Sequence, residues 1–123
     1  MPSSRKNRKI LVSITQAIIF CGKQTIALRG HEEDKGNYRA LLSFQAKHDP
    51  VLKEHLERGD ARSMYLSSDI QNELIAICGN LISEQIVSNC NRATCFGFMA
   101  DEATDASTME QMAMCLRYYD GAD

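Results

Sequence analysis

The sequence has 123 residues, of which 44% are hydrophobic and 24% are charged, so it forms one globular domain or a piece of one. Its formal net charge of −2 excludes a strong overall attraction to nucleic acid. No apolar run approaches the length of a membrane span and no signal-peptide core follows the first residues, so we expect no membrane partner.

The first nine residues are basic, with Arg5, Lys6, Arg8 and Lys9 close together. We interpret residues 1–9 as a basic tail, which is either the solvated start of a helix or disordered. The alternative is a nuclear-import or phosphate-contacting patch, and in that case these four side chains would bind DNA weakly.

Apolar residues at helical spacing follow the basic segment. They are Ile10, Ile14, Ala17, Ile18 and Cys21. The spacing predicts a helix over about residues 7–25, with Gly22 as a weak point near its end.

Gly30 and Gly36 then bracket a charged run, which predicts a loop. Within it, His31, Glu33 and Asp34 suggest a metal site. A solvated turn is the better interpretation, because no other residue of the segment supplies converging ligands.

Two short helices are expected next. Asn37 is predicted to cap the first, which ends near residue 47, and Asp49 with Pro50 predicts the N-cap and first position of the second. Gly59 is predicted to end that helix. Its inner stripe consists of Val51, Leu52, His55 and Leu56. We expect His48 and His55 to be surface or capping residues rather than catalysts.

The longest helix is predicted over residues 69–89, after an extended connection at 61–66. Ser68 and Gln71 have the spacing of a capping box, in which Gln71 would bond back to the Ser68 amide. The apolar stripe that predicts core packing consists of Ile70, Leu74, Ile75, Ile77, Cys78, Leu81, Ile82, Ile86 and Val87.

Two strands are predicted at the end of the chain, over residues 95–100 and 112–118. Both faces of these strands are largely apolar, so we expect both to be covered. Asp101 directly follows the first strand, with Glu102, Thr104 and Asp105 after it. A carboxylate at a strand end is well placed to bind a metal ion.

The five cysteines, Cys21, Cys78, Cys90, Cys95 and Cys115, show no two-residue spacing of a zinc knuckle. We expect free, largely buried thiols in a reducing compartment. A metal site formed by Cys90 and Cys95 is the less favoured alternative, since no nearby His completes it.

Several motifs, in order, resemble the hAT transposase superfamily, and in particular its domesticated copies, such as zinc finger MYM-type proteins and repressors of the inhibitor of the protein kinase. The motifs are Ala-Asp-Glu-Ala-Thr-Asp at 100–105, Glu-Gln at 110–111, Leu-Arg-Tyr at 116–118, Ile-Ala-Leu-Arg-Gly-His at 26–31, Gly-Asn-Tyr at 36–38, Asp-Pro-Val-Leu at 49–52, His-Leu at 55–56 and Asp-Ile-Gln-Asn-Glu-Leu-Ile at 69–75. The resemblance covers about residues 7–120 and departs at Ala103, where relatives more often carry Ser or Thr. It also implies a packing or salt-bridge role for Arg29.

The resemblance implies a ribonuclease-H-like domain, in which carboxylates hold Mg²⁺ for attack on a phosphodiester. Asp101 matches the first acidic ligand, and Thr104 and Asp105 would shape the loop. Further acidic ligands lie much later in the family, and Glu102 should point away from Asp101. We therefore expect a vestigial site with no cofactor in this chain and no enzyme activity.

The sequence thus predicts an α+β fold: four helices followed by a β-hairpin that looks like the first two strands of a truncated ribonuclease-H-like domain. We divide it into the basic tail (1–9), a helical region (10–93) and the incomplete domain (94–123). The resemblance implies a nuclear transposase fragment or remnant, ancestrally DNA-binding. The alternative is a domesticated helical protein-interaction module. The first strand would leave an edge open, which favours self-association.

Overall fold

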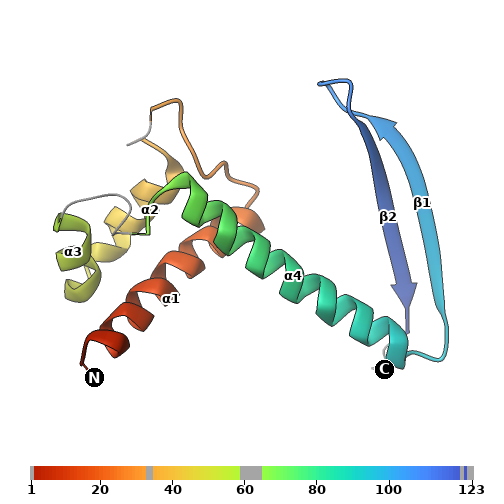
Figure 1. Ribbon diagram of the computed structural model, residues 1–123, viewed down its shortest axis with the longest axis horizontal. Coiled ribbons are helices and arrows are strands. Elements are labelled where there is room, and N and C mark those ends of the chain that lie inside the picture. Colours follow the sequence, from red (N-terminus) through yellow and green to blue (C-terminus); the bar gives the residue numbers. More distant parts are fainter. Residues whose placement is uncertain (1, 33–34, 59–64, 120, 122–123) are drawn as a thin grey trace. The chain divides into compact units, whose positions relative to one another are not determined.

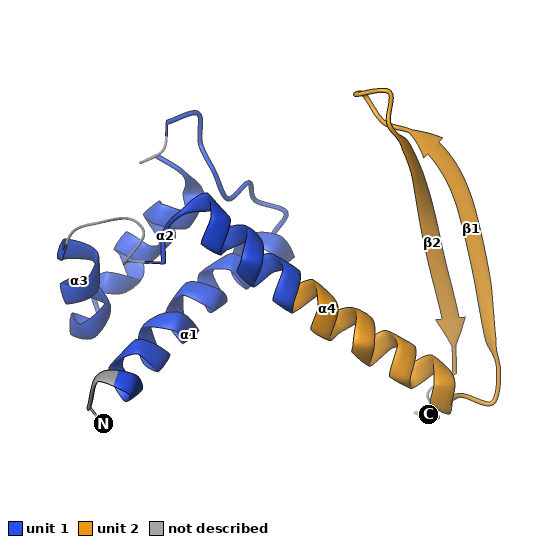
Figure 2. Ribbon diagram, in the orientation of Figure 1, with its two compact units in different colours: residues 1–77 blue, residues 78–123 orange. Residues whose placement is uncertain are grey.

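The computed structural model describes residues 2–32, 35–58, 65–119 and 121 (Figure 1). In these residues four helices precede a two-stranded antiparallel sheet, which is the predicted α+β order. The elements are α1 (Pro2–Lys23), α2 (Asn37–Ala46), α3 (Pro50–Glu57), α4 (Ser68–Arg92), β1 (Phe96–Thr104) and β2 (Glu110–Tyr118). The chain divides into two compact units, residues 1–77 and 78–123 (Figure 2). None of the described helices is long and apolar enough to cross a membrane.

The first unit is built around the apolar stripe of α1. All five residues predicted for this stripe are buried, and Ile14 is fully enclosed. The other buried members of this core are Tyr38, Leu42, Ala46, Leu52 and Leu66. Burial raises the pKa of Tyr38 to about 12, and its hydroxyl donates a hydrogen bond to the Tyr65 carbonyl at 3.4 Å.

The basic segment belongs to α1, which begins at Pro2 rather than near Asn7. A proline is tolerated in the first turn because the amide there has no intrahelical partner. We expected residues 1–9 to be either the solvated start of a helix or a disordered tail. The described part of this segment is the start of a helix.

The caps of the short helices differ from each other. Asp49 caps α3 as predicted, and its Oδ1 accepts hydrogen bonds from the amides of Val51 (3.0 Å) and Leu52 (3.2 Å). Asn37 does not cap α2, because Gly36 occupies that position. The Asn37 amide instead donates to the Ala27 carbonyl at 2.8 Å, which ties the preceding loop to α2.

The two glycines of that loop lie where two backbone segments nearly touch. A Cβ on Gly36 would lie 2.6 Å from the Leu28 carbonyl oxygen, and one on Gly30 would lie 2.5 Å from the Lys35 carbonyl oxygen. Only glycine fits such close approaches.

Three of the sequence predictions fall on residues outside the described part of the chain. These residues are Glu33 and Asp34 of the possible metal site, Gly59 at the predicted helix end, and residues 61–64 of the predicted extended connection.

The start of α4 does not form the predicted capping box. The Ser67 hydroxyl accepts from the Ile70 amide at 3.4 Å, while the buried Gln71 side chain donates to the Leu66 carbonyl at 3.1 Å. Gln71 turns inward because Arg29 Nε donates to its Oε1 at 3.1 Å. Arg29 also donates to Asn72 Oδ1 and to the Ser68 carbonyl, which gives it the partner that the sequence does not reveal.

The rest of α4 departs from the prediction of core packing. Leu74 packs against the core of the first unit, but Leu81 and Ile82 are each 60% exposed. Ile77 and Val87 are also more than half exposed. The prediction is wrong for this stretch because no described element covers the stripe after Leu74.

The strands are longer than predicted, and they pair without interruption from Phe96↔Tyr118 to Thr104↔Glu110. Every residue of the hairpin is exposed except Tyr118, which is half-buried. The expectation of cover on both faces is therefore wrong for the described residues. Cys95 and Cys115 are exposed, whereas Cys21 and Cys90 are buried, and all five thiols are free.

Candidate functional site

Asp101, the predicted metal ligand, lies inside β1 and not at its end. It is paired with Ala113, and three more residues of β1 follow it. Because successive side chains of a strand alternate between faces, Glu102 lies on the opposite face of the hairpin. The strand thus separates the two neighbouring carboxylates, as the sequence predicted.

Asp105 organises the turn between the two strands. Its Oδ1 accepts hydrogen bonds from the Ser107 amide and hydroxyl and from the Met109 amide, at 2.9, 2.6 and 3.0 Å. These hydrogen bonds hold the pKa of Asp105 below its usual value, and the bond from the Ser107 hydroxyl has the largest effect. They also hold Thr108 in the left-handed region, at φ 62°. Asp105 thus has the loop-shaping role that the resemblance implies.

The residues present do not fit a Mg²⁺ site. Two-metal phosphoryl chemistry needs several converging carboxylates. Among the described residues no group of three or more Asp, Glu, His or Cys side chains could hold a metal ion. Asp101 is isolated on its face, and the oxygens of Asp105 are occupied by the turn. No catalytic step can therefore be derived for this hairpin.

The main surface feature of the hairpin is apolar. The side chains on the face opposite Asp101, called here the Phe98 face, are Phe96, Phe98, Ala100, Glu102 and Thr104 of β1 and Glu110, Met112, Met114, Leu116 and Tyr118 of β2. Phe98 is 57% exposed and Met114 is 70% exposed. The two acidic residues of this face lie near the turn. At the other end the Tyr118 hydroxyl accepts from the Asn89 amide of α4 at 3.1 Å.

The basic residues of the first unit form a second candidate site. Arg5, Arg8 and Lys9 are exposed on α1, at the spacing that places them on one side of a helix. Lys6 is half-buried and its Nζ lies 2.6 Å from the Glu54 carboxylate of α3. The Lys6 hydrogen bond is the main cause that lowers the pKa of Glu54, with Arg58 adding to it. Three of the four predicted cations therefore remain for an anionic ligand.

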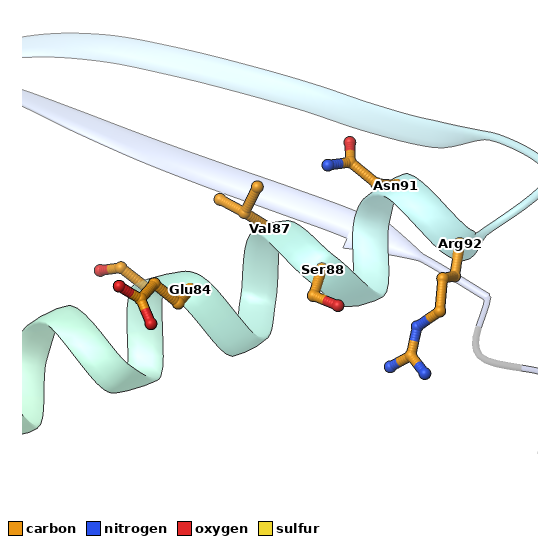
Figure 3. Close-up of a pocket in the computed structure, with 6 residues that line it drawn as sticks. Glu84, Val87, Ser88, Asn91 and Arg92 are labelled. Atoms are coloured by element: carbon orange, nitrogen blue, oxygen red, sulfur yellow. The ribbon is translucent and has the colours of Figure 1, made fainter.

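A shallow depression of about 500 Å³ lies along the second half of α4. Its lining residues are Ser83, Glu84, Val87, Ser88, Asn91 and Arg92, all on one helix (Figure 3). Val87 and Asn91 leave the helix on one side, and Arg92 leaves it on the other. With no second described element among its walls, this depression cannot enclose a small ligand.

A comparison with protein families identifies the chain. The family described as ZMYM1/FAM200, RNase-like domain, matches residues 2–122. The chain belongs to this family. It is therefore a transposase-derived domain of the hAT type, as its motifs predicted.

Two curated relatives carry the same name, 52 kDa repressor of the inhibitor of the protein kinase. The chain is 25% identical to the protein from Mus musculus over 127 residues, which cover 96% of this chain and 17% of that protein. It is 26% identical to the protein from Homo sapiens over 125 residues, which cover 94% of this chain and 16% of that protein. The chain thus spans about a sixth of their length. No solved structure matches it significantly.

The role of Asp101 as a first acidic ligand stays a prediction, and no cluster of described residues that could hold a metal ion includes it. The feature that the sequence interpretation missed is the difference between the two faces of the hairpin. The register of nine residue pairs shows which side chains share a face. The sequence alone indicates that Phe96, Phe98 and Ala100 lie on one side of the first strand. Only the strand pairing sets them opposite Tyr118, Leu116 and Met114.

Proposed function

We propose that this chain is a domesticated transposase remnant that acts in the nucleus as a protein-interaction module and does not catalyse strand transfer. The observation that carries the proposal is the contrast on the hairpin. Its acidic residues are dispersed, while its Phe98 face exposes large apolar side chains. Contiguous exposed apolar surface is typical of protein-binding sites, and isolated carboxylates do not assemble a two-metal centre. The name that both relatives carry, a repressor of the inhibitor of the protein kinase, supports a regulatory role.

The proposal is tested with supercoiled plasmid DNA in the presence of Mg²⁺ or Mn²⁺. We expect no nicking and no strand joining, because Asp101 has no converging partner among the described residues. The variants Asp101→Ala and Glu102→Ala remove the same charge from opposite faces of β1, so they form a matched pair. Metal-dependent nicking that is lost in Asp101→Ala and kept in Glu102→Ala would disprove the proposal.

A second function, weak DNA binding, is favoured by the three exposed cations on α1. Arg5, Arg8 and Lys9 are free to contact phosphates, whereas Lys6 pairs with Glu54. We propose that this binding is independent of DNA sequence and sensitive to salt, since phosphate contacts release condensed counterions. Three contacts correspond to a log–log salt slope of roughly −2.7.

The salt slope is measured by titration of labelled duplex DNA at several salt concentrations. The triple variant Arg5→Ala, Arg8→Ala, Lys9→Ala should abolish binding, while Lys6→Met should leave the slope unchanged because Lys6 is engaged by Glu54. Binding that survives deletion of residues 1–9 would show that another surface contacts the DNA.

A further inference from the structure

We propose that Glu54 of α3 limits the DNA-binding surface of α1, because its carboxylate holds Lys6 and Arg58 and keeps both cations from phosphate. This inference rests on the proposed weak DNA binding and names the residue that keeps the binding weak. All the contacts that carry it lie inside the first compact unit, residues 1–77. In that unit α1 and α3 pack against each other.

The Glu54 carboxylate bridges two cations that come from different helical segments. Its Oε2 lies 2.6 Å from Lys6 Nζ of α1, and its Oε1 lies 2.6 Å from Arg58 Nη2 at the end of α3. Each cation therefore already has an anionic partner. The Lys6 hydrogen bond, followed by the charge of Arg58, lowers the pKa of Glu54, so this carboxylate is ionised at neutral pH.

The cations of α1 form one continuous arc around the helix, and the arc ends at α3. At about 100° per residue, their order around the helix is Arg8, Arg5, Lys9 and Lys6. Lys6 is the member nearest to α3, because it is half-buried and bonded to Glu54. Arg58, which is held by the other oxygen of Glu54, continues the arc onto α3.

The carboxylate of Glu54 and a DNA phosphate compete for the same partners. Both anions bind ammonium and guanidinium groups through charged oxygens. Glu54 is already part of the folded chain, whereas a phosphate must lose translational freedom to bind. The internal carboxylate is therefore the preferred partner of Lys6 and Arg58. Because a partly exposed ion pair contributes little to stability, removal of the Glu54 charge should leave the fold intact.

The salt dependence of DNA binding gives the first test. Glu54→Gln removes the charge and keeps the size of the side chain. Titration of labelled duplex DNA at several salt concentrations should give a log–log slope of roughly −2.7 for the wild type. The slope should steepen to roughly −4.5 in Glu54→Gln, because Lys6 and Arg58 add two phosphate contacts. Addition of Lys6→Met to this variant should bring the slope back to roughly −3.6.

Glu57→Gln is the matched control, since it removes the same charge from the same helix. Glu57 is exposed and its carboxylate lies 4.0 Å from Lys53 Nζ. A general effect of net charge on affinity should appear in both variants, but the slope of Glu57→Gln should stay at roughly −2.7. Circular dichroism checks that both variants are folded. An equal steepening in both variants would overturn the role of Glu54.

A titration with inorganic phosphate tests the inference without DNA. The side-chain nitrogen resonances of Lys6 and Arg58 are followed by NMR in the full chain. We expect both resonances to shift with phosphate in Glu54→Gln and to stay unchanged in the wild type over the same concentrations. An equal shift in the wild type would show that Glu54 does not keep these cations from phosphate.

The outcomes separate this inference from the proposed DNA binding. If the wild type did not bind DNA but Glu54→Gln gained the phosphate response, the proposed DNA binding would fail and the masked cation pair would stand. If both proteins bound DNA with the same slope, or Glu54→Gln showed no phosphate response, the role of Glu54 would fail and the DNA binding would stand.

Discussion

Helix α1 and the second half of α4 carry comparable apolar residues but differ in burial. In α1 the stripe that includes Ile10, Ile14 and Ile18 is buried. In α4, Leu81, Ile82 and Val87 are more than half exposed. The difference arises because α2 and α3 pack against α1, whereas the side chains of Leu81, Ile82 and Val87 in α4 remain more than half exposed among the described residues. Apolar periodicity therefore indicates which face of a helix can be buried, and the availability of a partner decides whether it is.

The largest effect that distinguishes the two helices is expected from matched truncations of isoleucine. Ile14→Ala removes a fully buried side chain and should lower the free energy of unfolding by about 2–5 kcal/mol. Ile82→Ala, at a position 60% exposed, should change it by less than about 0.5 kcal/mol. Urea unfolding followed by circular dichroism measures both. An equally large loss at Ile82 would mean that a partner covers α4 in solution.

Two glycines should respond in opposite directions to the same substitution. Gly36→Ala places a Cβ 2.6 Å from the Leu28 carbonyl oxygen and should destabilise the first unit by about 1–3 kcal/mol. Gly79→Ala adds a Cβ that meets nothing within 4 Å and should stabilise α4 by about 0.5–1 kcal/mol. Thermal unfolding compares the two variants. Destabilisation by Gly79→Ala would show that another surface approaches the helix closely there.

The smallest effect concerns two carboxylates whose pKa values are lowered, the half-buried Glu54 and the exposed Asp105. A lowered pKa in the folded state means that each carboxylate stabilises the fold above its unfolded pKa, and that this contribution is lost as pH falls through the folded pKa. For Glu54 the cause is the Lys6 hydrogen bond and the charges around it. For Asp105 the cause is hydrogen bonds from the neutral Ser107 and Met109 groups.

High salt should therefore separate these two carboxylates. Screening should return the pKa of Glu54 toward its ordinary value and leave that of Asp105 lowered. Titration of the side-chain carboxyl resonances by NMR measures both. If the pKa of Asp105 moved with salt as that of Glu54 does, charge rather than turn geometry would control the hairpin loop.

The sequence predicted most of the first unit, because its signals are local. The stripe of α1 and the Asp49–Pro50 cap of α3 each depend on a few neighbouring residues, and both are found. The candidate site was predicted only in part. The separation of Asp101 from Glu102 follows from strand alternation, but the strand continues past both of them. Strand ends depend on pairing between two segments, which no local pattern specifies.

The amino-acid sequence by itself determined the order of elements, the family and the placement of Asp101 and Glu102 on opposite faces of a strand, since these follow from spacing and motif. Tertiary structure alone decided the partners. In the folded chain Arg29 donates a hydrogen bond to Gln71, and Lys6 forms a salt bridge with Glu54. The strand register gives the hairpin one strongly apolar face. The physical reason is that these interactions join residues distant in sequence, so their geometry exists only once the backbone brings the segments together.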